Sequence, residues 1–185
     1  NYKGKINKVL FSSVVPSSYK LIKFFFKKKL NIKCKELKSV NLKKLLKINV
    51  NKKQVGSDRI ANAIAITKKN KNFIVIDFGT ATTLDVITNN IYLGGVIAPG
   101  VKLSLKSLIS KASLIPNVNL SKITKVIGKN TKNAVRSGFY WGYSGLIDSL
   151  IKLIIKQTHK SFDVILTGGL ADLYKDTLNK KVKID

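Results

Sequence analysis

FIVIDFGTATTLDVI, residues 73–87, is the stretch of sequence that decides the fold. Its first four residues are apolar and mostly β-branched, which predicts a buried strand, and residues 84–88 form a second run of this kind. Asp77, Gly79, Thr80 and two further threonines lie between the runs. We therefore predict a β-hairpin whose turn carries a carboxylate, a glycine and three hydroxyl groups.

The chemistry of this turn suits a phosphate ligand. Gly79 allows backbone N–H groups to approach a ligand closely, and the Thr80 hydroxyl can donate to a phosphate oxygen without adding charge. Asp77 is placed to bind a cation that accompanies phosphates. The same Asp-x-Gly-Thr sequence also occurs as an ordinary turn, in which the aspartate bonds its own backbone. The hairpin alone leaves both interpretations open.

Hydrophobic periodicity predicts further elements on both sides of the hairpin. A strand at residues 9–15 ends before a helix that runs to about residue 29, with Ser17 or Ser18 as its N-cap. The other expected elements are helices at 55–69, 101–112 and 132–157, strands at 91–97 and 162–166, a tight bend at 98–100, the start of a strand at 180–185, and ambiguous strand or turn at 32–40 and 42–50.

Two of these helices have apolar faces that are predicted to meet the core. The residues on them are Leu103, Leu105, Leu108 and Ile109 in the helix at 101–112, and Ala134, Val135, Ile147, Leu150, Ile151 and Ile154 in the long helix. Tyr140, Trp141 and Tyr143 near the middle of the long helix are expected to pack at a subunit contact, although a catalytic role stays open.

Polar residues mark the starts of two helices. Asp58 lies where the helix dipole favours a carboxylate, so it is either a plain N-cap or a functional group. The string Gly-Lys-Asn-Thr at 128–131 is similar to part of a P-loop, but it lacks the upstream glycine and the preceding strand. Thr131 is therefore expected in the N-cap region of the long helix.

Composition sets the outer bounds. The 185 residues are 44% hydrophobic, which is enough for one substantial core or for two small lobes that share a cleft. The net charge is +26, but only Arg59 and Arg136 are arginines and the lysines are scattered, so we do not expect a nucleic-acid partner. Lys27–Lys29, directly after Phe24–Phe26, is a solvated helix end or, as the alternative, a binding patch.

Cys34 and His159 are the only residues of their types. An internal disulfide, a transition-metal cluster and a Ser-His-Asp triad are therefore not expected, and His159 is interpreted as a surface or helix-end residue. No apolar run reaches the ~20 residues that span a bilayer, which predicts a soluble, cytoplasmic protein. The chain has no methionine and begins at Asn1, so we expect sequence to be missing in front and also at the far end.

Five motifs in this order resemble type III pantothenate kinases over about residues 9–170. They are GSDRIANA at 56–63, DFGTATT at 77–83, GGVIAPGVKLSLKSL at 94–108, IGKNTKNAVRSG at 127–138 and TGG at 167–169. The resemblance implies an α/β actin-like ATPase (ASKHA, ribonuclease H-like) fold, with a mixed sheet and flanking helices. Residues 1–69 would be the remainder of an N-terminal lobe with the substrate-site helix, and residues 70–185 the C-terminal lobe.

The resemblance also implies the reaction and the roles of single residues. ATP would phosphorylate pantothenate to 4′-phosphopantothenate, the first step of coenzyme A biosynthesis, with Asp58 as the general base. Pantothenate would contact Gly56, Ser57, Asp58 and Arg59, and Thr131 across a homodimer interface. ATP would contact Gly79, Thr80, Gly168 and Gly169. Asp77 would hold a monovalent cation, K⁺ or NH₄⁺, and Mg²⁺ would accompany the nucleotide.

Two departures from the family pattern matter. Ser57 replaces the alanine most common at that position, a change too small to disturb the pocket. The first phosphate hairpin, D-x-G-N-T, does not occur in these 185 residues, so we expect this chain alone to be inactive but dimeric. The competing hypothesis is a non-catalytic family member that acts as a transcriptional accessory factor or a basic nucleic-acid-binding protein.

Overall fold

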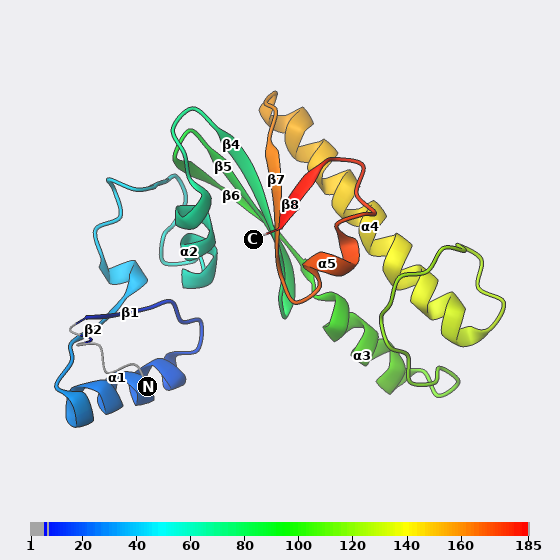
Figure 1. Ribbon diagram of the computed structural model, residues 1–185, viewed down its shortest axis with the longest axis horizontal. Coiled ribbons are helices and arrows are strands. Elements are labelled where there is room, and N and C mark those ends of the chain that lie inside the picture. The colour runs from blue at the N-terminus through cyan, green and yellow to red at the C-terminus, as the bar shows by residue number, and fades with distance from the viewer. Residues whose placement is uncertain (1–5, 7, 185) are drawn as a thin grey trace.

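The computed structural model describes residues 6 and 8–184 (Figure 1). Its elements in chain order are β1 (Val9–Phe11), α1 (Pro16–Leu30), β2 (Cys34–Glu36), the 3₁₀ helix η1 (Leu37–Ser39), β3 (Lys47–Ile48), α2 (Ser57–Ile66), β4 (Asn72–Phe78), β5 (Ala81–Thr88), β6 (Ile91–Pro99), α3 (Val101–Lys111), α4 (Thr131–Thr158), β7 (Asp163–Gly168), α5 (Ala171–Tyr174) and β8 (Val182–Ile184).

The larger of two sheets has six strands in the order β3-β6-β5-β4-β7-β8. The β4–β5 and β5–β6 pairs are antiparallel, and the β3–β6, β4–β7 and β7–β8 pairs are parallel. This confirms the predicted hairpin, the third antiparallel strand, the strand before the Thr-Gly-Gly motif and the short strand near residue 185. A separate two-stranded parallel sheet pairs β1 with β2, and α1 connects these strands.

The strands of the hairpin run further than the sequence predicts. Asp77 pairs with Thr83 and Phe78 with Thr82, so the connection is reduced to Gly79 and Thr80. Strand pairing continues through the polar residues because each added pair satisfies backbone hydrogen-bonding groups. The aspartate and two of the three threonines are therefore strand residues, and the predicted longer turn is wrong.

The same reason corrects the bend at residues 98–100. Ala98 pairs with Thr82 and Pro99 with Ala81, so β6 continues to Pro99. Gly100 then acts as the N-cap of α3. A Cβ atom at this glycine would lie 2.0 Å from the Thr80 carbonyl oxygen. Gly100 thus lets the start of α3 lie directly against the hairpin turn.

Helices cover both faces of the larger sheet (Figure 1). Ile74 and Ile76 of β4 pack in one core with α3, α4 and α5, whereas Phe73 and Val75 pack in a second core with α2 and the segment before it. This is the alternation that a strand buried on both faces requires. The predicted domain boundary near residue 70 remains a prediction. Of the elements that precede it, β3 is an edge strand of the larger sheet and α2 packs against that sheet.

Several helix predictions need correction. Helix α1 begins at Pro16 after Val15, and neither Ser17 nor Ser18 is the N-cap, because proline is already suited to the first turn of a helix. The strand before it is short and ends at Phe11. Helix α2 is confined to Ser57–Ile66.

The apolar faces are confirmed only in part. In α3, Leu105 is buried but Leu103 is 53% exposed and Leu108 is also exposed. In α4, Ile147, Ile151 and Ile154 are buried, whereas Ala134 near the start of the helix is exposed. The Val101 and Tyr140 side chains complete the packing against β4 and β5.

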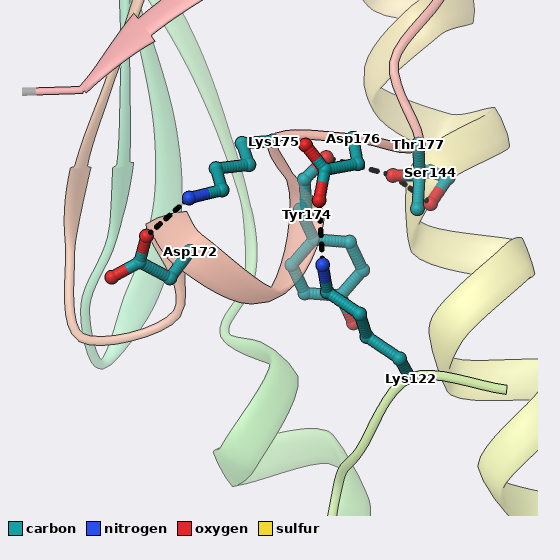
Figure 2. Close-up of polar contacts among 7 residues, drawn as sticks. All are labelled: Lys122, Ser144, Asp172, Tyr174, Lys175, Asp176 and Thr177. Carbon is teal, nitrogen blue, oxygen red and sulfur yellow. Dashed lines mark hydrogen bonds and ion pairs between the residues drawn. The ribbon is translucent and has the colours of Figure 1, made fainter.

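Polar contacts fasten the segment after β7 to α4 and to the loop that precedes α4 (Figure 2). The Ser144 hydroxyl donates to Thr177 Oγ1 at 2.7 Å, and an ion pair joins Lys122 to Asp176 at 2.5 Å. The Tyr174 ring is fully buried, and its hydroxyl donates to the Phe139 carbonyl oxygen at 3.0 Å. Asp172 and Lys175 form a further exposed ion pair within the same segment. Helix α5 is therefore held firmly on α4.

Candidate active site

The candidate site lies between α2 and one face of the larger sheet. Along β4, Asp77 follows Phe73 and Val75 in the alternation, so it belongs to the face that α2 covers. Asp85 pairs with Val75 on the neighbouring strand β5 and contacts α2 through Arg59. The sheet thus presents two carboxylates to the first turns of the helix.

Asp77 is half-buried and linked to α2 by one hydrogen bond. Asn62 Nδ2 donates to Asp77 Oδ2 at 3.1 Å. Burial raises the pKa of the Asp77 carboxyl above its usual value, the hydrogen bond from Asn62 opposes this shift, and the negative charge of Asp58 adds to it. The negative charge of Asp58 therefore disfavours the charged form of Asp77. A cation bound near Asp77 would lower the free-energy cost of keeping its carboxylate charged.

Arg59 forms a buried ion pair with Asp85. The guanidinium Nε donates to Asp85 Oδ1 at 2.7 Å, and Nη2 lies 2.6 Å from the same oxygen. The Tyr92 hydroxyl donates to this oxygen as well, at 2.6 Å. The Asp85 side chain is fully buried, and burial raises the pKa of its carboxyl, while the hydrogen bonds from Arg59 and Tyr92 oppose the shift.

Asp58 occupies the first turn of α2 with its side chain exposed. The N-cap of α2 is Gly56 and Asp58 is already within the helix, so the interpretation of Asp58 as a plain N-cap is wrong. A Cβ atom at Gly56 would lie 2.3 Å from Asp58 Oδ1, so the glycine leaves room for the carboxylate. The Ser57 hydroxyl is buried and donates to Glu36 Oε1.

The residues predicted to contact ATP meet at one end of β4 and β7. Gly79 and Thr80 form the exposed hairpin turn, and Gly168 pairs with Phe78 across the parallel ladder. Gly168 has a φ of +87°, and a Cβ atom there would lie 2.6 Å from Asp77 Oδ1. Gly169 follows in open space. Asp77 thus lies between the hairpin turn and the glycine pair.

Thr131 is not brought to this group of residues. It is exposed and is the first residue of α4, after Asn130, whose side chain caps the helix by accepting from Asn133 N at 2.9 Å. Helix α4 covers the face of the sheet opposite α2 (Figure 1). Within one chain, Thr131 and Asp58 therefore lie on different sides of the sheet.

Sequence reasoning missed three polar residues of this site: Asn62, Asp85 and Tyr92. Asn62 lies four residues after Asp58 and hence on the same helix face, which was a usable signal. A charged residue inside an apolar strand, as Asp85 is in β5, was a second signal. Nothing in the local sequence links Asp85 to Arg59, which lies 26 residues away.

Two absences concern the described part of the chain alone. Residues 6 and 8–184 contain no group of three or more His, Cys, Asp or Glu side chains that could hold a metal ion. None of the helices described is long and apolar enough to cross a membrane. His159 is the C-cap of α4 and is exposed, as predicted.

The fold and the site together define a class of protein. A glycine-threonine turn beside a half-buried carboxylate suits the phosphates of a nucleotide, and an exposed aspartate on the opposing helix suits a second substrate. This arrangement defines a nucleotide-dependent phosphotransferase built on a mixed sheet. The predicted mixed sheet with flanking helices is confirmed.

Comparisons with known proteins identify the family. The family model for type III pantothenate kinase matches residues 1–153. The chain is 58% identical to a type III pantothenate kinase of Pelagibacter ubique over 186 aligned positions, which are all of this chain and 75% of that protein. It is also 41% identical to the enzyme of that name from Sulfurihydrogenibium, over 94% of the chain and 70% of the relative. The chain therefore belongs to the type III pantothenate kinase family.

Other similarities are partial or show the fold alone. A type III pantothenate kinase of Koribacter versatilis is 43% identical over 66% of the chain, which is 46% of that protein. A crystal structure of a conserved protein assigned to the Baf family of transcriptional activators, from Campylobacter jejuni, is similar with a TM-score of 0.63. That similarity covers 98% of this chain and 77% of the other at 24% identity.

Proposed function

We propose that the protein containing this chain transfers the γ-phosphoryl group of ATP to the primary hydroxyl of pantothenate, which yields ADP and 4′-phosphopantothenate. This is the first step of coenzyme A biosynthesis, and we infer a cytoplasmic location for it. The observation that carries the proposal is the exposed Asp58 carboxylate on α2, whose negative charge acts on Asp77 beside the hairpin turn. Membership of the family supports the same reaction.

Each residue has a distinct part in this proposal. Asp58 accepts the proton of the attacking hydroxyl, because a primary alcohol must lose it during phosphoryl transfer. The Thr80 backbone N–H and the Thr80 hydroxyl donate to the phosphates, whereas the Gly79 N–H donates to the Ala81 carbonyl oxygen at 3.1 Å and shapes the turn. Gly168 and Gly169 offer a backbone free of side chains to the adenosine part of ATP.

The cation proposal rests on the surroundings of Asp77. Its Oδ2 is engaged by Asn62, whereas its Oδ1 faces the backbone of Gly168. A site with a single carboxylate and otherwise neutral backbone groups suits a monovalent cation, K⁺ or NH₄⁺. A divalent ion would be expected to have several carboxylate ligands. Mg²⁺ bound to the nucleotide would neutralise charge on the phosphates.

A homodimer would supply Thr131 to the site of the other copy. The aromatic residues of α4 do not support it as expected, because Tyr140 is buried and Tyr143 donates to Ser104 Oγ at 2.8 Å within the chain. The support comes instead from small exposed residues on one face of α4. They are Ala134, Gly138, Gly142 and Gly145, and such a face allows a second helix to approach closely.

The test is a coupled ADP assay on the longest product of the reading frame that contains these residues. ATP-dependent conversion of pantothenate is expected, and Asp58→Asn should lower kcat by ~10²-fold or more without loss of folding, because the amide keeps the shape and removes the base. Asp163→Asn is the matched control, since Asp163 is exposed at the other end of β7. A wild-type protein without turnover would refute the proposed reaction, and near-normal turnover of Asp58→Asn would refute the role of the base.

A further inference from the structure

Arg59 is an unusual residue for its position in α2. It lies in the first turn, where the helix dipole disfavours a positive charge. Its side chain is only 13% exposed and lies between the helix and the sheet. A buried guanidinium at the unfavourable end of a helix needs a specific partner.

The sheet provides a socket for this guanidinium, formed by Asp85, Tyr92 and Gly95. Asp85 Oδ1 accepts from Arg59 Nε at 2.7 Å and from the Tyr92 hydroxyl at 2.6 Å. Gly95 pairs with Asp85 on β6, and a Cβ atom there would lie 2.6 Å from Arg59 Nη2. Two strands thus fit the Arg59 side chain: β5 provides the Asp85 carboxylate, and β6 provides the Tyr92 hydroxyl and, at Gly95, the room for the guanidinium.

We propose that the socket is a positioning device for Asp58: Asp85 holds Arg59, and Arg59 fixes the first turn of α2 over the sheet. The proposal rests on the proposed function of Asp58. The backbone N–H of Arg59 also donates to Asp58 Oδ1 at 2.8 Å. Arg59 therefore contacts Asp58 through its backbone and Asp85 through its side chain. Asn62 and Asp77 form a second link one helical turn further along, and Ser57 is held by Glu36 outside the larger sheet, so Arg59 is the first-turn residue that links α2 to the sheet through a side-chain hydrogen bond.

The proposal predicts an effect on kcat for residues that the substrates do not touch. Asp85 and Tyr92 are both fully buried, so neither touches a substrate, and their hydrogen bonds connect them to Arg59. Displacement of a catalytic group by a fraction of an ångström slows the chemical step more than it weakens substrate binding. Loss of the socket should therefore lower kcat and leave the KM for pantothenate nearly unchanged.

Tyr92→Phe is the variant that tests this, in the longest product of the reading frame. It removes one donor to Asp85 and keeps the ring, and kcat should fall by ~10-fold with KM within ~2-fold of wild type. Tyr174→Phe is the matched control, because this fully buried tyrosine also donates one hydrogen bond, to the Phe139 carbonyl on the opposite face of the sheet. The control should lose similar thermal stability and keep kcat.

A double-mutant cycle separates positioning from general loss of structure. In the Asp58→Asn background, Tyr92→Phe should cause no further fall in kcat, because the group it positions is already absent. Equal effects of Tyr92→Phe with and without Asp58 would overturn the proposal, as would a change in KM alone or a kcat equal to that of Tyr174→Phe. Failure of the proposed function would look different, since the wild-type protein would then lack activity.

Discussion

At the scale of single residues, the burial of Asp77 makes the stability of the protein depend on pH. Burial and the charge of Asp58 raise the pKa of its carboxyl above the ordinary value of 3.8, against the opposing hydrogen bond from Asn62. Because the folded pKa lies above the unfolded one, the native state binds the proton more tightly. The contribution of Asp77 to stability is therefore fully present below the unfolded pKa and is lost as the pH rises through the folded pKa.

Asp77→Asn removes this dependence, so the variant should gain stability relative to wild type as the pH rises above about 4. Urea unfolding at a series of pH values, in a buffer without K⁺ or NH₄⁺, measures the difference. Asp85 is also buried, but it is present in both proteins and its contribution cancels. Wild-type and variant stabilities that change in parallel with pH would contradict the prediction.

The same substitution should weaken activation by a monovalent cation. A carboxylate provides charge as well as a ligand oxygen, whereas the amide of Asp77→Asn provides only the oxygen. Titration of activity with KCl should show a curve shifted to higher K⁺ for the variant, with the KM for pantothenate less affected. Choline chloride at equal ionic strength is the control for screening. An unchanged activation curve would make Asp77 a structural residue of β4.

At the scale of elements, the sequence predicted those helices and strands that depend on local residue patterns. Alternation and apolar runs located the hairpin, the long helix and the strand before Gly168, since each depends on its own residues. The ends of strands were missed, because pairing to Pro99 and through Asp77 is decided by the neighbouring strand. The motif residues of the site were found by resemblance, whereas the ion pair of Arg59 with Asp85 needed the packing of α2 on the sheet.

The connection between β7 and α5 allows a matched test of two adjacent glycines. Gly168 has a left-handed φ, and an added Cβ would also lie 2.8 Å from the backbone N and O of Phe78, which cannot move aside. Gly168→Ala should therefore destabilise the protein by about 1–3 kcal/mol and impair ATP use. A Cβ at Gly169 meets nothing within 4 Å, so Gly169→Ala should cost less than about 1 kcal/mol. Thermal unfolding of both variants makes the comparison, and equal losses would contradict it.

At the scale of the whole molecule, the charge of +26 opposes the association of two copies. A dimer formed through the small-residue face of α4 must bury enough surface to overcome this repulsion. Salt screens charges beyond about 10 Å at 0.1 M, whereas contacts between closely packed helices are little affected. The dimer should therefore become more stable as the salt concentration rises, which is the opposite of an association driven by ion pairs.

Sedimentation of the purified 185-residue chain in low and high salt measures this dependence. A coupled ADP assay on the same samples should show no turnover. The reaction needs hydrogen-bond donors on both sides of the γ-phosphate, whereas this chain carries one phosphate hairpin. Gly142→Leu should shift the chain toward monomer, since a large side chain on the small-residue face keeps two helices apart. Gln157→Leu, exposed near the end of α4, is the control that should stay dimeric. A monomer at every salt concentration would refute the dimer, and turnover by the 185 residues alone would refute the need for a second hairpin.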